Sequence, residues 1–265
     1  MSLHVESVGA GPPLVLLHGW GLHGGIFTPL LLSLAQRHRV HVIDLPGHGH
    51  SASIAPYTLD AVVDSVVGSL DNDAQVDAGV PLAILGWSFG GTVAQRFAAR
   101  HPQRIACLAL VCTTPRFVSG ADWPHGVAPR VLEQFGDELR VAYVPTIRRF
   151  LSLQMQNVAA ARPTLALMRA QLEARPQADP AALAGALAIL ESADLRDAAP
   201  TLAMPALVVA GGRDTLTPAG AGAWLADTMP DARLAPITEA AHIPFLSHPA
   251  EFTAAVAPFL DAHAA

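Results

Sequence analysis

One sharp turn in the sequence constrains the fold more than any other feature. An apolar run over 81–85 is typical of a buried strand, and it leads directly into Gly86-Trp87-Ser88-Phe89-Gly90-Gly91. Residues 92–100 then have the apolar spacing of a helix. A strand-to-helix turn of this kind leaves no room for Cβ atoms two residues before and after Ser88, which accounts for Gly86 and Gly90.

Ser88 is expected to have a strained backbone, with its hydroxyl directed out of the sheet at the N-terminus of the helix. The helix dipole and the free main-chain N–H groups at that end favour a negatively charged oxygen. The same pentapeptide also occurs by chance, as a glycine-rich turn with an uninvolved serine. The strand before it and the helix after it favour the interpretation of Ser88 as a nucleophile.

Length, charge and cysteine content restrict the class of protein. A chain of 265 residues suits one α/β domain with an insertion, and its net charge of −6 argues against a general nucleic-acid-binding protein. No apolar run approaches the ~20 residues that cross a bilayer, and residues 1–10 lack the features of a signal peptide. Cys107 and Cys112 lie on opposite faces of one predicted strand, so they cannot pair. We expect a cytoplasmic monomer with no membrane partner and no nucleic-acid partner.

Strand and helix patterns alternate along most of the chain. This alternation predicts an α/β fold with a mostly parallel central sheet, helices on both faces and ligands at the C-terminal strand ends. From residue 113 helical patterns follow one another without strands, which predicts an inserted helical lid. We therefore divide the chain into a core, residues 1–112 and 194–265, and a lid, residues 113–193. The predicted strands are 14–17, 39–44, 81–85, 105–111, 206–210 and 234–238, and the predicted helices are 58–71, 92–100, 127–139, 143–157, 163–174, 180–190 and 249–262.

A serine hydroxyl becomes a strong nucleophile when a base removes its proton and a third group fixes the tautomer of that base. The turn Gly86-Trp87-Ser88-Phe89-Gly90-Gly91 is called the elbow below. After an elbow of this kind, the three catalytic residues follow in the chain order serine, acid, histidine. Asp214 follows a predicted strand and so lies at a C-terminal strand end, while His242 lies on a loop after the last strand. Asp194 and Asp197 precede their strand and His248 precedes a proline, so we interpret these three as capping or surface residues. The predicted catalytic residues are Ser88, Asp214 and His242, which are together called the relay below.

The loop His18-Gly19-Trp20-Gly21 follows the predicted strand 14–17 and is expected to supply a second N–H donor to the oxyanion. We assign the two donors to the main-chain N–H groups of Trp20 and Phe89. The alternative is an ordinary turn with Trp20 packed in the core. No metal site and no organic cofactor is predicted, because His48 and His50 lie in a glycine-rich turn without cysteine or carboxylate partners.

The sequence resembles the pimeloyl-[acyl-carrier protein] methyl ester esterases of biotin synthesis, a family with the α/β-hydrolase fold. The elbow and the relay indicate only that fold, whereas Trp20, Trp87 and the lid run 149–154 are more specific. The resemblance covers nearly the whole chain. The motifs that carry it are His18-Gly19-Trp20-Gly21-Leu22, Gly86-Trp87-Ser88-Phe89-Gly90-Gly91, Trp123-Pro124, Arg149-Phe150-Leu151-Ser152-Leu153-Gln154, Asp194-Leu195-Arg196 and the stretch from Ala240 to Phe252.

The resemblance also implies which residues bind the substrate and which meet an acidic acyl-carrier protein. Arg149 and Arg162 fall where the family has arginines for the carrier, and Arg148 and Arg169 are expected to assist them. Pro145 and Ala166 stand where further basic residues are usual, and Phe89 replaces a usual leucine. The residues expected to contact the acyl chain and the methyl ester are Trp20, Ser88, Phe89, Phe150, Leu151, Ser152, Leu153, Gln154 and His242.

The residues themselves support an apolar substrate. Neutral aromatic and aliphatic side chains around the predicted site suit an alkyl chain better than a charged small molecule. Between Arg116 and Arg175 the sequence has eight arginines against five acidic residues, which is enough charge to steer an acidic partner. The alternative for these arginines is a set of solvated helix faces. The predicted apolar lining is Trp20, Trp87, Phe89, Trp123, Phe150, Leu153 and Phe245.

We expect a serine esterase that hydrolyses the methyl ester of pimeloyl-[acyl-carrier protein] to the free acid and methanol through an acyl-enzyme. The same relay would serve a general short-chain carboxylesterase or a C–C bond hydrolase that acts on ring-cleavage products. A dehalogenase or an epoxide hydrolase of this fold would have an aspartate in place of Ser88. A binding protein that retains the relay without catalysis is the non-enzymatic alternative.

Overall fold

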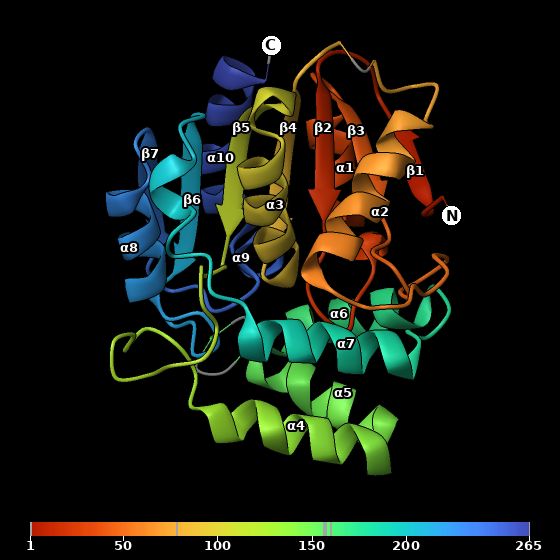
Figure 1. The fold of residues 1–265 in the computed structure, drawn as a ribbon, viewed down its shortest axis with the longest axis vertical. Helices are drawn as coiled ribbons and strands as arrows, with labels where there is room; N and C mark the ends of the chain where they lie inside the picture. Colours follow the sequence, from red (N-terminus) through yellow and green to blue (C-terminus); the bar gives the residue numbers. More distant parts are fainter. Residues whose placement is uncertain (1, 78, 156–157, 160, 265) are drawn as a thin grey trace.

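The computed structural model describes residues 2–77, 79–155, 158–159 and 161–264. Within these residues one sheet has the strand order β1-β3-β2-β4-β5-β6-β7, and its pairs are parallel except for β1 with β3 (Figure 1). The prediction of a mostly parallel sheet is confirmed. The strands are β1 (Val5–Val8), β2 (Pro13–Leu17), β3 (Arg39–Ile43), β4 (Leu82–Trp87), β5 (Ile105–Val111), β6 (Ala206–Gly211) and β7 (Ala232–Ile237).

The central strands are predictable because helices cover both of their faces. Every residue of β2, β4 and β6 is buried, so these strands read as continuous apolar runs. The edge strand β1 was not predicted, because it is short and its side chains alternate between half-buried and exposed positions. It pairs antiparallel with β3, with Val5 opposite Ile43.

Helices on the two faces of the sheet complete the core. The helices α2 and α3 cover one face and α1 and α10 the other, while α8 packs against β6 and β7 (Figure 1). No helix in the described part of the chain is long and apolar enough to cross a membrane. The helices α1 and α8 and the short α9 were not predicted. The bounds are α1 (Thr28–Leu34), α2 (Leu59–Asp71), α3 (Phe89–Arg100), α8 (Ala219–Thr228), α9 (Pro244–Ser247) and α10 (Pro249–His263).

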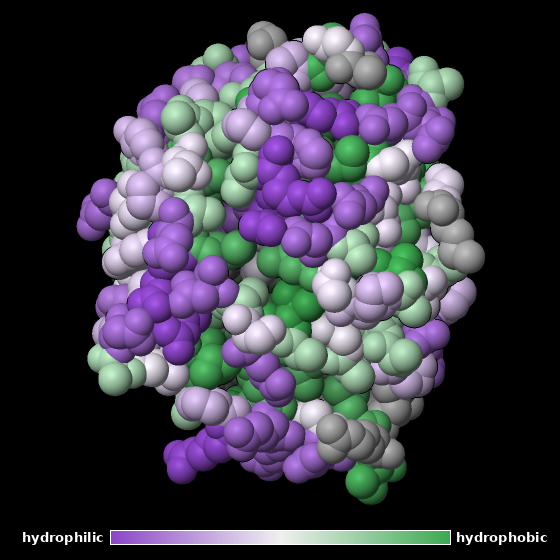
Figure 2. Space-filling model, in the orientation of Figure 1, coloured by the Kyte–Doolittle hydropathy of each residue, from purple (hydrophilic) through white to green (hydrophobic). Residues whose placement is uncertain are grey.

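A group of helices between β5 and β6 lies beyond the C-terminal ends of the strands, where the arrows of Figure 1 point. The first helix of the group begins at Pro129 and the last ends at Ser192. The groove between α4 and α7 opens on the face shown in Figure 2, where apolar residues gather between the polar surfaces of α2, α3 and α4. The helices of this group are α4 (Pro129–Val141), α5 (Tyr143–Leu153), α6 (Ala161–Glu173) and α7 (Pro180–Ser192).

A buried ion pair joins this group of helices to the core. Arg175, in the link between α6 and α7, donates to both carboxylate oxygens of Asp44 at 2.8 Å. Asp44 follows β3, is fully buried, and also accepts the main-chain N–H of Gly24 at 2.7 Å. Burial raises the pKa of Asp44, but the main-chain donors and Arg175 outweigh burial and hold it below its usual value. The carboxylate therefore remains charged and binds three separate segments together.

Candidate active site

The elbow has the strained geometry that the sequence predicts. Ser88 lies between β4 and α3 with φ 54° and ψ −120°, a region that is costly for any residue with a side chain. A Cβ on Gly90 would lie 2.1 Å from the carbonyl oxygen of Leu17, and a Cβ on Gly86 would lie 2.6 Å from that of Gly90. The main chain of Ser88 is fixed by its N–H bond to the Val111 carbonyl at 3.0 Å. The turn therefore holds the serine hydroxyl in one place.

The structure brings the three predicted relay residues together from segments far apart in the sequence. The Ser88 hydroxyl donates to Nε2 of His242 at 2.8 Å, and Nδ1–H of His242 donates to Oδ2 of Asp214 at 2.8 Å. The side chains of His242 and Asp214 are 1% and 0% exposed, so water does not screen their interaction. This geometry fits an imidazole that removes a proton from the serine and remains oriented by the acid.

Asp214 is held in its charged form. Burial raises its pKa, but the charge of His242 and the hydrogen bonds from His242 and Thr217 outweigh burial and lower the pKa below its usual value. Main-chain N–H groups of Leu216 and Thr217 donate to Oδ1 at 2.8 and 3.0 Å. An ionised acid in this position stabilises an imidazolium, as proton transfer from the serine requires.

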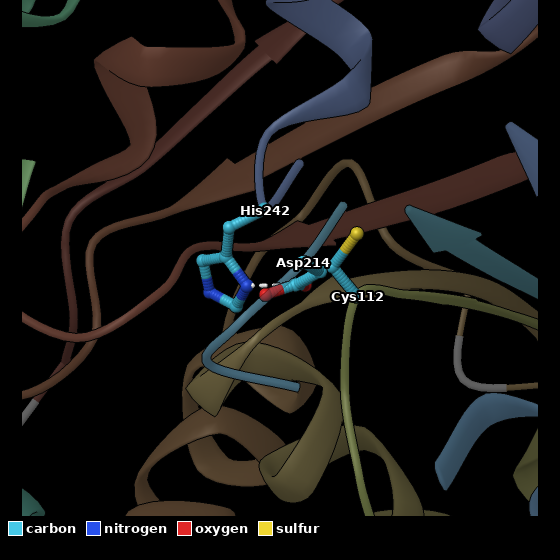
Figure 3. Close-up of side chains that lie close together, drawn as sticks. All are labelled: Cys112, Asp214 and His242. Carbon is cyan, nitrogen blue, oxygen red and sulfur yellow. Dashed lines mark hydrogen bonds and ion pairs between the residues drawn. The ribbon is translucent and has the colours of Figure 1, made fainter. Parts of the chain in front are cut away.

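Cys112 lies beside the acid and the imidazole at the end of β5, as Figure 3 shows. One ligand atom from each of Cys112, Asp214 and His242 lies within 4.8 Å of the others, which is the spacing of a metal site. However, the Cys112 thiol donates to the main-chain carbonyl of Ala241 at 3.6 Å, and burial and the nearby Asp214 raise its pKa well above its usual value. The Asp214 oxygen nearest the ring already accepts Nδ1–H, so the cluster fits a proton relay better than a metal site.

The predicted oxyanion loop passes directly beside the nucleophile. A Cβ on Gly19 would lie 3.2 Å from the Cβ of Ser88. His18 fixes this loop, because its Nδ1–H donates to the Gly19 carbonyl at 2.8 Å and its Nε2 accepts the Leu45 N–H at 2.9 Å. Burial and the nearby His48 lower the pKa of His18 to about 3, so the ring stays neutral. The main-chain N–H groups of Trp20 and Phe89 donate to no acceptor among the described residues, which leaves both available to an oxyanion.

An apolar pocket opens above the serine hydroxyl. Its side chains leave a free volume of only about 10 Å³, about the space of one water molecule, so the pocket is nearly closed in this structure. Trp20 and Phe150 meet edge to face at its wall, with ring centroids 4.8 Å apart. Ser88 supplies the only hydroxyl among its lining residues. The lining is Trp20, Ser88, Phe117, Val131, Leu132, Phe135, Phe150, Leu187, Leu190 and Leu216.

Most of this lining was missed by sequence reasoning. The lining residues of α4 and α7 recur at helical spacing. On α4 they are Val131, Leu132 and Phe135. This signal identifies an apolar helix face but does not distinguish a face on the core from a face on a pocket. Leu216, in the loop after Asp214, has no such pattern.

The predicted substrate residues of α5 have different environments. Phe150 lines the pocket, while Leu151 is buried and Leu153 is half-buried. Ser152 is exposed, and its hydroxyl donates to a main-chain carbonyl one turn earlier at 3.0 Å. Gln154 is buried, and its main-chain carbonyl accepts the N–H of His242 at 3.2 Å. The end of α5 therefore contacts the histidine loop directly.

Two predicted tryptophans lie outside the pocket lining, and one of them supports the site. The indole N–H of Trp87 donates to the main-chain carbonyl of His242 at 2.7 Å, which fixes the histidine loop. Trp123 does not line the pocket. Its ring packs edge to face on Trp224, and its N–H donates to the carbonyl of Arg116 at 2.8 Å. The structure therefore places Trp123 in a cluster between the chain after β5 and α8.

The predicted carrier-docking arginines lie on α5 and α6 and are all exposed. Arg149 forms an ion pair with Glu138 of α4, and its guanidinium lies 5.2 Å from the centre of the Phe135 ring. Arg148, Arg162 and Arg169 form no ion pair with any residue in the described ranges. The groove between α4 and α7, in contrast, has the acidic side chains Glu133, Asp137 and Glu191 in its lining.

Comparisons with known proteins identify the family. A family model described as "alpha/beta hydrolase fold" matches residues 12–249. The chain is 44% identical to the pimeloyl-[acyl-carrier protein] methyl ester esterase of Chromobacterium violaceum over the full length of both, and 39% identical to that of Nitrosomonas europaea, covering 95% and 96% of the two chains.

Solved structures show the same fold. An esterase from Exiguobacterium antarcticum superposes with a TM-score of 0.87 at 20% identity, over 97% of this chain and 95% of that one, and shows the shared fold. A hydrolase from Pseudomonas aeruginosa has a TM-score of 0.82 at 29% identity, over 97% and 93%. The chain therefore belongs to the α/β-hydrolase fold family and, within it, to the family of the pimeloyl-[acyl-carrier protein] methyl ester esterases.

Proposed function

We propose that this protein is a serine esterase that hydrolyses the methyl ester of pimeloyl-[acyl-carrier protein] in biotin synthesis, releasing methanol. The observation that carries the proposal is the continuous hydrogen-bonded chain from Ser88 through His242 to Asp214, at 2.8 Å for each step, beneath an apolar pocket. Relatives that are named for this activity and match the whole chain supply the substrate class.

The first half-reaction forms an acyl-enzyme. His242 removes the proton of Ser88 while the serine oxygen attacks the ester carbonyl, and Asp214 stabilises the resulting imidazolium. The main-chain N–H groups of Trp20 and Phe89 bind the negative oxygen of the tetrahedral intermediate. His242 then gives its proton to the departing methoxide, which leaves as methanol.

The second half-reaction uses the same groups in the opposite order. His242 removes a proton from a water molecule, which attacks the acyl carbonyl and releases the free carboxylate and the Ser88 hydroxyl. Loss of a single oxyanion donor typically lowers the rate of such a reaction on the order of 100- to 1000-fold. No cofactor takes part in this scheme.

The pocket and the rim suit an acyl chain on a carrier. The lining between α4, α5 and α7 is hydrocarbon apart from the nucleophile and the Trp20 indole N–H, and that N–H donates to the Leu183 carbonyl at 3.0 Å. We assign carrier docking to the exposed arginines of α5 and α6, because the acidic side chains along the α4–α7 groove would repel an acidic protein. In this proposal α4–α7 form a lid, and the enzyme acts as a cytoplasmic monomer.

A general carboxylesterase remains the second candidate, and one observation favours it. Glu138 forms an ion pair with Arg149, which is one of the arginines that the proposal assigns to carrier docking. A small ester needs no docking surface, so this ion pair would not impair its hydrolysis.

The test compares the parent protein with Ser88→Ala on a carrier-bound pimeloyl methyl ester, followed by mass spectrometry of the carrier. The parent should remove one methyl group from each carrier, and Ser88→Ala should not. A fluorophosphonate should label the parent at Ser88 and leave the variant unlabelled. An unlabelled parent would refute the serine mechanism, whereas a labelled parent that hydrolyses methyl butyrate and not the carrier ester would refute only the substrate.

A further inference from the structure

Asp214 accepts four hydrogen bonds from the described residues, and they are divided between its two carboxylate oxygens. Oδ1 accepts the main-chain N–H groups of Leu216 and Thr217. Oδ2 accepts the hydroxyl of Thr217 at 2.6 Å and Nδ1–H of His242 at 2.8 Å. The oxygen that orients the imidazole is therefore shared with a hydroxyl that lies 3.4 Å from Nδ1.

The hydroxyl of Thr217 lies within the relay, and its shortest hydrogen bond goes to Asp214. The residue is 4% exposed, so its hydroxyl has little access to solvent. Because a charge-assisted O–H···O bond at this distance is strong, the hydroxyl also fixes the direction in which Oδ2 points. Sequence reasoning selected Asp214 by its place in the chain order and had no pattern that would select Thr217.

We propose that Thr217 is a positioning residue of the relay, whose hydroxyl directs Oδ2 toward His242 and limits how strongly Asp214 stabilises the imidazolium. The inference rests on the proposed esterase function, in which His242 acts as a base. A hydrogen bond to a carboxylate oxygen draws electron density from it, so less negative charge remains for a second donor on the same atom. The neutral imidazole, which is the form that accepts the serine proton, then persists to lower pH.

Among the described residues, the other groups near the imidazole lie at the end of β5, on adjoining loops, at the elbow and at the end of α5. The Cys112 thiol, at the end of β5, has a pKa raised well above its usual value and stays protonated in the range of an esterase assay. On adjoining loops, Arg213 and Glu239 form an exposed ion pair with each other. The elbow and α5 present Ser88 and a main-chain carbonyl of Gln154, which carry no charge.

Thr217→Val tests the proposal because it removes the hydroxyl and keeps the branched shape and both main-chain donors. The low-pH limb is the range in which kcat/KM for methyl butyrate falls as the pH is lowered. We expect the midpoint of this limb to move to a higher pH by about half to one unit. At a pH below the midpoint, kcat/KM should then be about three- to tenfold lower than in the parent. The rate on the high-pH plateau should change by less than about threefold. Thr217→Ser keeps the hydroxyl and should restore the limb of the parent.

Matched controls separate this effect from a loss of stability. Thr114→Val removes another buried hydroxyl, one that donates to the Arg116 carbonyl, and should leave the limb unmoved. The proposal is overturned if the low-pH limb of Thr217→Val coincides with that of the parent or lies at a lower pH. An upward shift that Thr217→Ser also shows overturns it as well, because the methyl group and not the hydroxyl would then be responsible.

A second measurement does not depend on turnover. Nitrogen NMR of histidine-labelled protein follows the His242 ring during titration, and its signals are identified by their loss in His242→Gln. The midpoint should be higher in Thr217→Val than in the parent by the same half to one pH unit. If the parent hydrolyses no ester, the proposed function fails, while this titration still decides whether Thr217 restrains the imidazolium.

Discussion

His48 offers a direct test of how burial governs the acid stability of this fold. The ring is fully buried, its Nδ1–H donates to the Pro46 carbonyl at 3.0 Å, and its Nε2 forms no hydrogen bond with any described residue. Burial lowers the pKa of His48 from 6.5 to about 4, because a charged ring would lose its hydration. Between these two values the unfolded chain binds a proton at His48 that the folded chain does not.

The sign of the effect follows from this difference in proton binding. Stability linked to His48 is fully present above pH 6.5 and is lost progressively as the pH falls toward about 4. At pH 5 the loss is about 2 kcal/mol, from 1.36 kcal/mol per unit over the 1.5 units below 6.5. For a chain of this size, 1 kcal/mol corresponds to roughly 2–4 °C in Tm, so the contribution of His48 is about 4–8 °C.

His48→Phe removes the titrating group and keeps an aromatic ring in the same place. Differential scanning calorimetry at pH 7, 6 and 5 should show that Tm of the parent falls about 4–8 °C more than Tm of the variant. His50→Gln, an exposed histidine of the same turn, is the matched control and should follow the parent. Parallel curves for the parent and His48→Phe would refute the claim that burial of this ring penalises acid.

The remaining predictions concern docking, the elbow and the link to the core. Arg149→Glu with Arg162→Glu should lower kcat/KM on the carrier-bound ester by about tenfold or more and leave methyl butyrate hydrolysis within about twofold. Gly90→Ala should abolish esterase activity and lower the free energy of unfolding by about 1–3 kcal/mol, because its Cβ would lie 2.1 Å from a main-chain carbonyl. Arg175→Gln should lower the free energy of unfolding by about 3–5 kcal/mol in urea titrations, since it leaves the Asp44 carboxylate buried without its cation.

Each of these predictions has a control within the same chain. Arg37→Glu reverses an exposed charge outside α4–α7 and should affect both esters equally. Gly68→Ala adds a Cβ where nothing lies within 4 Å and should not destabilise the helix. Asp44→Asn combined with Arg175→Gln should cost less than Arg175→Gln alone, and a larger loss in the double variant would contradict the ion-pair explanation.

The local features of this protein follow from its sequence, because they depend on sterics within a few residues. The strained turn at Ser88 is predictable since Gly86 and Gly90 have no other reason to flank a serine between an apolar strand and a helix. Chain order then selects Asp214 and His242 from many acids and histidines. The buried central strands are predictable for a similar reason, as parallel strands covered on both faces are apolar throughout.

Only the tertiary structure decides which apolar faces meet and which charges pair, because these contacts join residues far apart in the sequence. It places Leu187 and Phe135 at the pocket and Trp123 away from it, although all three have the same apolar character. It also sets Glu138 against Arg149 and the hydroxyl of Thr217 against the acid of the relay. The sequence gives the chemical character of each side chain, whereas the fold decides which other residue lies beside it and changes its charge or orientation.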